Sequence, residues 1–199
     1  ETFFNYYRKY MLMPPLEPSQ GFYALAELER RGKLQCSIAN NVHNLPGRAG
    51  CKKILNLHGT IYDNECPRCG KKYSMEYMRD SRKVPLCQEC MVPVRPKVLL
   101  FGEQVDNQVM TEAVGEISRA EVLLLLGTSI NSGLCDGYVQ YFHGKTMIII
   151  HAQKHFTDEK ADVVLHEEVK SALPRIVWPE GRDDGSAESE NAEDAENAD

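Results

Sequence analysis

Four cysteines form two closely spaced pairs, Cys66/Cys69 and Cys87/Cys90, with 17 residues between the pairs. A Cys-x-x-Cys turn can hold two thiolates on one ion, and two such turns complete the tetrahedron that zinc prefers. Four thiolates leave no open coordination position, so we expect a structural zinc site rather than a catalytic metal. The alternative is a set of four buried or redox-active cysteines, and the spacing favours zinc over it.

A second candidate for chemistry is His58, which ends a predicted strand in the run Leu57-His58-Gly59. In a parallel sheet, the carboxyl ends of the strands face the ligand crevice. A histidine at that edge can act as a general base near neutral pH. On position alone, a histidine with a purely structural hydrogen bond is the commoner outcome.

A third candidate is the run Gly127-Thr128-Ser129, which follows the apolar segment 122–126. A glycine at the end of a strand lets a ligand approach the backbone, and the two hydroxyls can donate to ribose or phosphate oxygens. A simple turn after a strand has the same composition, so this run is a weak signal by itself.

These side chains depend on the elements that position them. Apolar runs predict strands at 34–38, 54–57, 98–101, 122–126, 146–150 and 162–165. Helical spacing predicts helices at 2–13, after Ser19, after Asp106 or Asn107, and after residue 165 as far as Pro174. Buried strands that alternate with helices predict an α/β fold, with a parallel sheet covered on both faces.

The cysteine pairs interrupt this alternation and predict an insertion. We expect a helical part of a small module at 1–17, the first part of the sheet domain at 18–58, the zinc-binding module at 59–94, the second part of the sheet domain at 95–178, and a tail at 179–199. The tail is acidic and lacks large apolar residues, so we expect it to be disordered.

The formal net charge of −6 is concentrated in the tail. Residues 181–199 hold eight acids and one arginine, which leaves a net charge of +1 for the rest of the chain. With no dense basic run, a nucleic-acid-binding module driven by phosphate contacts is disfavoured. No apolar run is long enough to span a membrane, and the chain shows no leader peptide. The cysteine pattern favours a metal site in the reducing cytoplasm over a disulfide framework.

The motifs occur in an order that resembles the sirtuin (Sir2) family of NAD-dependent protein deacylases. The resemblance covers approximately residues 3–177. The matching elements are Leu57-His58-Gly59, the two cysteine pairs, the segment 95–103 ending in Phe101-Gly102-Glu103, Gly127-Thr128-Ser129, and the strand 147–150 followed by His151.

The resemblance implies a Rossmann-like parallel sheet with helices on both faces, plus a small zinc-ribbon insertion. It implies NAD as co-substrate and an acyl-lysine protein or peptide as substrate. The acyl oxygen attacks C1′ of the nicotinamide ribose, nicotinamide leaves, and His58 acts as the base on a ribose hydroxyl. By resemblance, the catalytic residues are His58 and Asn41; the NAD-binding residues are Asn40, Asn41, His43, Gly127, Thr128, Ser129 and His151; and the residues beside the peptide are Val98, Phe101, Gly102 and Glu103.

The chain departs from the family pattern at several positions. The family's opening strand and Gly-Ala-Gly-x-Ser loop are expected before Glu1. His43 stands where the family has an aspartate that contacts the nicotinamide carboxamide, Pro46 replaces a histidine, and His151 replaces an asparagine. These changes support an alternative: a catalytically impaired module that binds NAD, ADP-ribose or a protein partner. A zinc-ribbon adaptor for nucleic acid is a third hypothesis, disfavoured by the charge.

Overall fold

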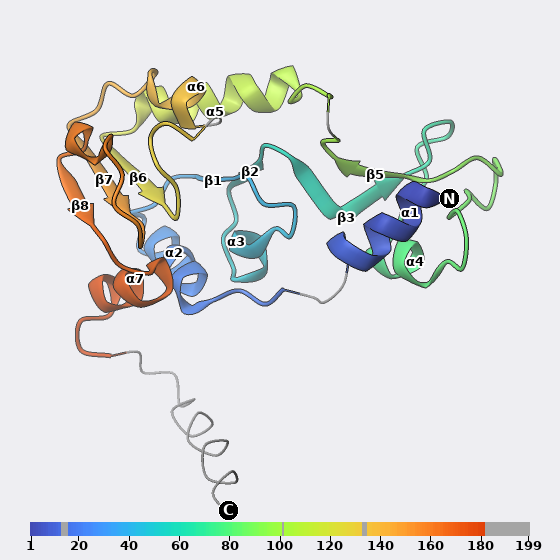
Figure 1. Ribbon diagram of the computed structural model, residues 1–199, viewed down its shortest axis with the longest axis horizontal. Helices are drawn as coiled ribbons and strands as arrows, with labels where there is room; N and C mark the ends of the chain where they lie inside the picture. The colour runs from blue at the N-terminus through green and yellow to red at the C-terminus, as the bar shows by residue number, and fades with distance from the viewer. Residues whose placement is uncertain (13–15, 101, 133–134, 182–199) are drawn as a thin grey trace, which may run out of the picture.

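The computed structural model describes residues 1–12, 16–100, 102–132 and 135–181 (Figure 1). Phe101 and residues 182–199, with most of the predicted acidic tail, lie outside the described residues. The helices are α1 (Thr2–Tyr6), η1 (Tyr7–Met11), α2 (Gln20–Arg30), α3 (Leu45–Arg48), α4 (Met75–Asp80), α5 (Asn107–Arg119), α6 (Cys135–Val139), η2 (Asp158–Lys160) and α7 (Val169–Val177). The strands are β1 (Ser37–Ala39), β2 (Ile54–Asn56), β3 (Gly59–Glu65), β4 (Lys72–Tyr73), β5 (Arg95–Val98), β6 (Val122–Leu126), β7 (Thr146–Ile150) and β8 (Val163–Leu165).

The predicted parallel sheet is present as β6-β7-β8, with both strand pairs parallel. Its side chains alternate between two cores, because successive residues of a strand point to opposite faces. On one face, Leu124 and Ile150 pack with α2 and α7. On the other face, Leu125 and Ile149 pack with residues of α6. Helices therefore cover both faces of this sheet, as the alternating pattern predicted (Figure 1).

Strands β1 and β2 form a separate parallel pair, in which Ser37–Ala39 matches Ile54–Asn56. Within the described residues, this pair is not hydrogen-bonded to β6-β7-β8. Ile54 nevertheless packs against the core shared by α2 and α7. The parallel arrangement thus consists of two hydrogen-bonded pieces on a common core instead of one continuous sheet.

The third sheet, β4-β3-β5, is antiparallel and lies at the opposite end of the molecule (Figure 1). Its core joins the N-terminal helical segment to the cysteine region, with Tyr7 and Met78 fully buried. The Arg8 guanidinium also donates to the carbonyl oxygen of Lys83, 2.8 Å away. The N-terminal helix is therefore packed against the cysteine-bearing module.

Three sequence expectations about elements are wrong. The strand predicted at 98–101 lies instead at Arg95–Val98 and pairs antiparallel with β3, outside the parallel sheet. Pro96 fits there because β5 is an edge strand, which does not need every N–H for pairing. The strand predicted at 34–38 is displaced to Ser37–Ala39. Pro174 lies inside α7 and does not end it, since the buried Leu173 and Val177 hold both sides of that turn in the core.

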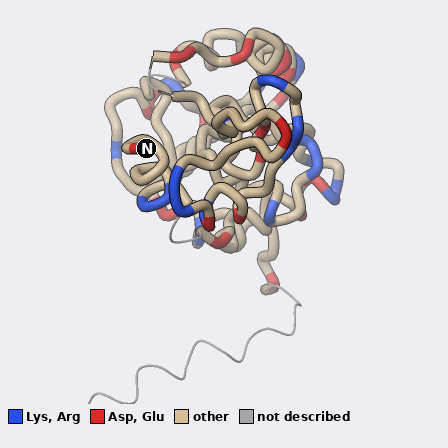
Figure 2. The backbone as a smooth tube through the Cα atoms, turned by 90° about the vertical axis from the view of Figure 1, so that its right-hand side faces the viewer, with Lys and Arg blue, Asp and Glu red and all other residues tan. Residues whose placement is uncertain are grey.

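Charged residues of both signs are distributed along the backbone. In Figure 2, both Lys and Arg segments and Asp and Glu segments occur on the side that carries the N-terminus. This mixture agrees with the nearly neutral charge of the chain without its tail. Among the described residues, no helix combines the length and the apolar character needed to cross a membrane.

Candidate active site and metal centre

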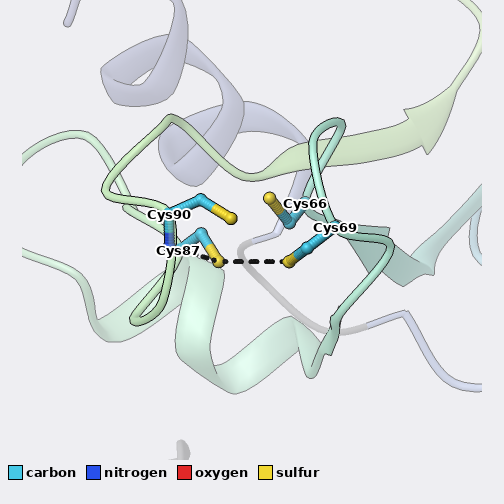
Figure 3. Close-up of side chains that lie close together, drawn as sticks. All are labelled: Cys66, Cys69, Cys87 and Cys90. Atoms are coloured by element: carbon cyan, nitrogen blue, oxygen red, sulfur yellow. Dashed lines mark hydrogen bonds between the residues drawn. The ribbon is translucent and has the colours of Figure 1, made fainter.

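Cys66, Cys69, Cys87 and Cys90, called here the cysteine cluster, come together from two turns (Figure 3). Their sulfur atoms all lie within 4.8 Å of one another. The turns are alike: the amide of Gly70 donates to the carbonyl of Cys66, and the amide of Met91 donates to that of Cys87, each at 2.9 Å. Gly70 and Met91 both have positive φ, at 73° and 55°. Two copies of one local turn therefore place four sulfurs around one centre.

Hydrogen-bond donors point at two of these sulfurs, those of Cys66 and Cys87. The Tyr73 hydroxyl donates to Cys87 Sγ at 3.2 Å and lowers the pKa of this thiol to about 6. The amides of Arg68 and Cys90 donate to Cys66 Sγ and Cys87 Sγ, each at 3.4 Å. A thiolate is the form that binds zinc.

Four close thiolates would repel one another, and a bound cation would neutralise them. The adjacent Cys69 thiol raises the pKa of Cys90 to about 12, opposite to the shift at Cys87. Four converging sulfurs with N–H and O–H donors fit a closed, structural zinc ion, as the spacing predicted.

His58 lies in the turn between β2 and β3, where the parallel pair meets the antiparallel sheet. The amide of Leu99 donates to the His58 carbonyl at 2.9 Å. Gly59 has a φ of 69°, and a Cβ placed on it would lie 1.8 Å from the carbonyl oxygen of Lys97. Only glycine fits such a close approach of two backbones. The predicted Leu57-His58-Gly59 run therefore fixes His58 at the junction of the two sheets.

Backbone hydrogen bonds attach the segment containing Asn40 and Asn41 to the same turn. The amide of Leu57 donates to the carbonyl of Ala39 at 2.9 Å, and the amide of Ile61 donates to that of Val42 at 3.0 Å. Asn40 is exposed and Asn41 is half-buried. The structure therefore brings the two predicted asparagines next to the His58 turn.

The side chains of this segment are already partly engaged. Asn41 Oδ1 accepts the amide of His43 at 3.2 Å, a local turn that orients the amide side chain. Burial, and then the nearby charge of Arg48, lower the pKa of His43. A neutral imidazole is therefore favoured at the position where the family carries a carboxylate.

Asn56, the last residue of β2, is a candidate that the sequence reasoning missed. Its Nδ2 donates to Asn44 Oδ1 at 3.4 Å, and its Oδ1 is buried without a partner among the described residues. A buried acceptor without a donor is unfavourable, and this one lies on the strand that leads into the His58 turn, so we treat Asn56 as a candidate ligand contact. The signal was available, because Asn56 also stands at the carboxyl end of a predicted strand.

The segment after β5 lies beside the His58 turn. Val98 is buried and pairs with Gly59. The Glu103 carboxylate accepts the amide of Leu100 at 3.0 Å and forms an ion pair with Arg95; these contacts lower the pKa of Glu103. Gly102 has a φ of 89°. Of the predicted peptide-side residues, Val98, Gly102 and Glu103 are thus described, and Phe101 falls outside the described part.

Gly127, Thr128 and Ser129 follow β6, as predicted. Gly127 has a φ of 65°, and its amide donates to the carbonyl of Ile150 at 2.9 Å. The Thr128 hydroxyl donates to Ser132 Oγ at 2.8 Å. The run is therefore a sharp turn at the carboxyl edge of the parallel sheet, with one hydroxyl engaged locally.

His151 follows β7 at the same edge, and its side chain is buried in a contact that the sequence did not predict. His151 Nε2 lies 3.0 Å from Asp158 Oδ1, and His166 Nε2 lies 2.8 Å from Asp158 Oδ2. His166 bonding is the largest cause that lowers the pKa of Asp158, to about 2. One signal was available: His151 and His166 each follow a parallel strand, and such strand ends meet at one edge.

Comparisons with known proteins agree with these features. Residues 1–132 match the family model described as "Sir2 family". An "NAD-dependent protein deacetylase" of Clostridium acetobutylicum is 33% identical over 178 residues, covering 89% of this chain and 73% of the relative. One of Cutibacterium acnes is 34% identical over 180 residues, with the same coverages.

Solved structures show the same likeness. One, described as the structural basis for the mechanism and regulation of Sir2 enzymes, has a TM-score of 0.79 and 28% identity, covering 88% of this chain and 75% of that chain. A complex described as Sir2, p53 peptide and NAD+ has a TM-score of 0.75 and 28% identity, covering 89% of this chain and 79% of that chain. The order of the motifs, the cysteine cluster and the His58 turn agree with these matches, and the chain belongs to the Sir2 family, the sirtuins.

Proposed function

We propose that this protein is an NAD-dependent protein-lysine deacylase, with deacetylation as its reaction. It consumes acyl-lysine, NAD and one water, and it produces free lysine, nicotinamide and O-acyl-ADP-ribose. The observation that carries this proposal is the His58 turn, because it holds an imidazole where the parallel pair, the Asn40–Asn41 segment and the antiparallel sheet meet. A half-buried histidine there is placed to act as a general base.

The residues around this turn take the roles that the resemblance implies. The acyl oxygen of the substrate forms a bond with C1′ of the nicotinamide ribose, and the bond to nicotinamide breaks. Asn41 helps to hold the reacting groups, and His58 takes a proton from a ribose hydroxyl. Val98, Phe101, Gly102 and Glu103 border the acyl-lysine peptide. The position of Val98, paired with Gly59, supports this assignment.

The NAD-binding residues divide between two places. Asn40, Asn41 and His43 stand on the nicotinamide side, where the unpartnered Asn56 Oδ1 supplies an acceptor suited to a carboxamide N–H. Gly127, Thr128, Ser129 and His151 stand at the carboxyl edge of β6-β7-β8, the edge at which open α/β sheets bind their ligands. We assign them to the adenosine and phosphate side.

Zinc holds together the two turns of the antiparallel module and takes no part in the reaction, because the cysteine cluster leaves no open coordination position. None of the seven cysteines is in a disulfide. This supports the proposal that the protein works in a reducing compartment, the cytoplasm.

The test is nicotinamide release from NAD in the presence of an acetyl-lysine peptide. We expect release to depend on the peptide and to fall by about 100-fold or more in His58→Ala, the usual effect of losing a general base. The exposed His143 provides the matched control, and His143→Ala is expected to keep full activity.

A different result would favour the second candidate function, a binding module without turnover. One observation favours this binding module: His43 stands in place of the family's aspartate, and the pKa of its imidazole is lowered. A folded, zinc-loaded chain that binds ADP-ribose but releases no nicotinamide would support that alternative. Equal activity in His58→Ala and the unaltered chain would reject the assigned base.

A further inference from the structure

His151, Asp158 and His166, called here the histidine–aspartate cluster, gather potential metal ligands far along the chain from the cysteine cluster. Each offers one ligand atom, and these atoms all lie within 4.8 Å of one another. Both imidazoles point their Nε2 atoms at one carboxylate, at 3.0 Å and 2.8 Å. The three groups come from the ends of β7 and β8 and from η2.

The backbone holds each member in place. The amide of His151 donates to the carbonyl of Leu165 at 3.1 Å, which ties the end of β7 to the end of β8. The amide of His155 donates at 2.9 Å to Asp158 Oδ2, the oxygen that also faces His166 Nε2, and so helps to orient the carboxylate. The neighbouring Thr157 is almost fully buried. Such outer contacts orient ligands in known metal sites.

The spacing suits one ion. Ligands about 2.0–2.2 Å from a common ion stand about 3 Å apart at right angles and slightly further apart in a tetrahedron. The two Nε2–oxygen distances are close to this separation, so small shifts would admit an ion in place of the bridging protons. The side chains of His151 and Asp158 are 8% and 10% exposed, whereas that of His166 is 32% exposed. Two of the three groups are thus buried, while the His166 imidazole is reachable from solvent.

We propose that the histidine–aspartate cluster is a second metal site, which takes a divalent transition-metal ion of the zinc class. Two imidazoles and one carboxylate suit zinc and its first-row neighbours, whereas magnesium and calcium prefer oxygen ligands alone. Three protein ligands leave a coordination position open to water. This site therefore exchanges its ion readily, in contrast to the closed cysteine cluster.

The experiment uses the full chain with zinc already in the cysteine cluster and Co2+ as the probe ion. We expect one further equivalent of Co2+ per chain. Its absorption spectrum should lack the intense sulfur-to-cobalt bands of a thiolate site, because the ligands are nitrogen and oxygen. Zinc content is measured in parallel, so that displacement from the cysteine cluster is recognised.

Variants of the cluster then test whether these residues bind the added Co2+. His166→Ala is expected to weaken Co2+ binding at least about tenfold, since even outer contacts of metal ligands are worth about 10–100-fold in affinity. Asp158→Asn is expected to do the same and keeps the shape of the side chain. His143→Ala, which removes an exposed histidine elsewhere, is expected to bind Co2+ like the unaltered chain.

Three outcomes would overturn the proposal: no second equivalent of Co2+, unchanged binding in both His166→Ala and Asp158→Asn, or equal loss in His143→Ala. Circular dichroism and zinc content show whether each variant is folded. If His166→Ala is unfolded, the Co2+ affinity of Asp158→Asn tests the proposal. His151 is shared with the proposed NAD-binding residues, so the variants alter only Asp158 and His166, which have no assigned role in NAD binding. The readout measures metal binding and not deacylation, so its failure is distinguishable from failure of the proposed function.

Discussion

The cysteine cluster and the histidine–aspartate cluster are both groups of metal-binding side chains, but they are assembled differently. In the cysteine cluster, each half forms within one four-residue turn, and the two turns then meet. In the histidine–aspartate cluster, His151 and His166 meet only because β7 pairs in register with β8, Ile150 opposite Leu165. The first is visible as a spacing in the sequence, and the second depends on strand pairing.

This difference predicts unequal costs of damage. Loss of zinc removes the interaction that joins two separate turns, whereas the parallel sheet retains its two apolar faces without any ion. We therefore expect the antiparallel module to depend on its metal and the sheet β6-β7-β8 to be largely independent of it.

The largest expected effect is that of Cys87→Ala. It removes a fully buried ligand and the acceptor of the Tyr73 hydroxyl, so we expect loss of zinc and of about 3–5 kcal/mol in the free energy of unfolding. Zinc content and denaturant unfolding measure this change. Cys36→Ala, at a half-buried cysteine outside the cluster, is the control and should cost less than about 1.5 kcal/mol. Equal costs in the two variants would contradict the metal role.

The next effect concerns the junction between the two kinds of sheet. Gly59 and Gly32 both have a φ of 69°, but only at Gly59 does a Cβ meet a backbone, the carbonyl oxygen of Lys97. Gly59→Ala is therefore expected to cost about 3 kcal/mol or more, and Gly32→Ala only the strain of about 1–2 kcal/mol. Thermal unfolding of both variants measures the difference. Similar losses of stability in the two variants would mean that the close contact with β5 does not hold the His58 turn in place.

A smaller effect is expected inside the module. Tyr73→Phe removes the hydroxyl that donates to Cys87 Sγ, so the pKa of this thiol rises from about 6 and zinc binds more weakly. We expect zinc affinity to fall about 10–100-fold, the usual effect of losing an outer contact of a ligand. Competition with a chromophoric chelator measures the zinc affinity. The substitution should leave the sheet β6-β7-β8 intact. An unchanged affinity would show that the two amide donors hold the thiolates without help.

The smallest effect has the opposite sign. The Tyr7 hydroxyl is buried without a partner among the described residues, and burial raises the pKa of this phenol. Tyr7→Phe removes an unsatisfied polar group and is expected to stabilise the protein by about 1 kcal/mol. Denaturant unfolding measures it. A loss of stability would reveal a partner for that hydroxyl.

Four features could be predicted from the sequence alone: the cysteine cluster, the His58 turn, the capped helix after Asp106, and the apolar strands 122–126 and 146–150. These features are local: a spacing, a cap or a run of apolar residues specifies each of them. The Leu57-His58-Gly59 motif is also visible in the sequence. The reason that it needs a glycine is visible only in the structure, where the backbone of Lys97 in β5 lies against Gly59.

The pairing of the strands became known from the folded structure and not from the sequence. The folded structure placed β5 antiparallel to β3, divided the parallel strands into two pieces, kept Pro174 inside a helix, and joined His151 to Asp158 and His166. Each outcome depends on contacts between residues that are distant in the chain. The free energy of such a contact comes from apolar side chains that are buried together and from the register in which two strands pair. A single sequence shows the apolar residues that such contacts require, but not which partner each strand will meet.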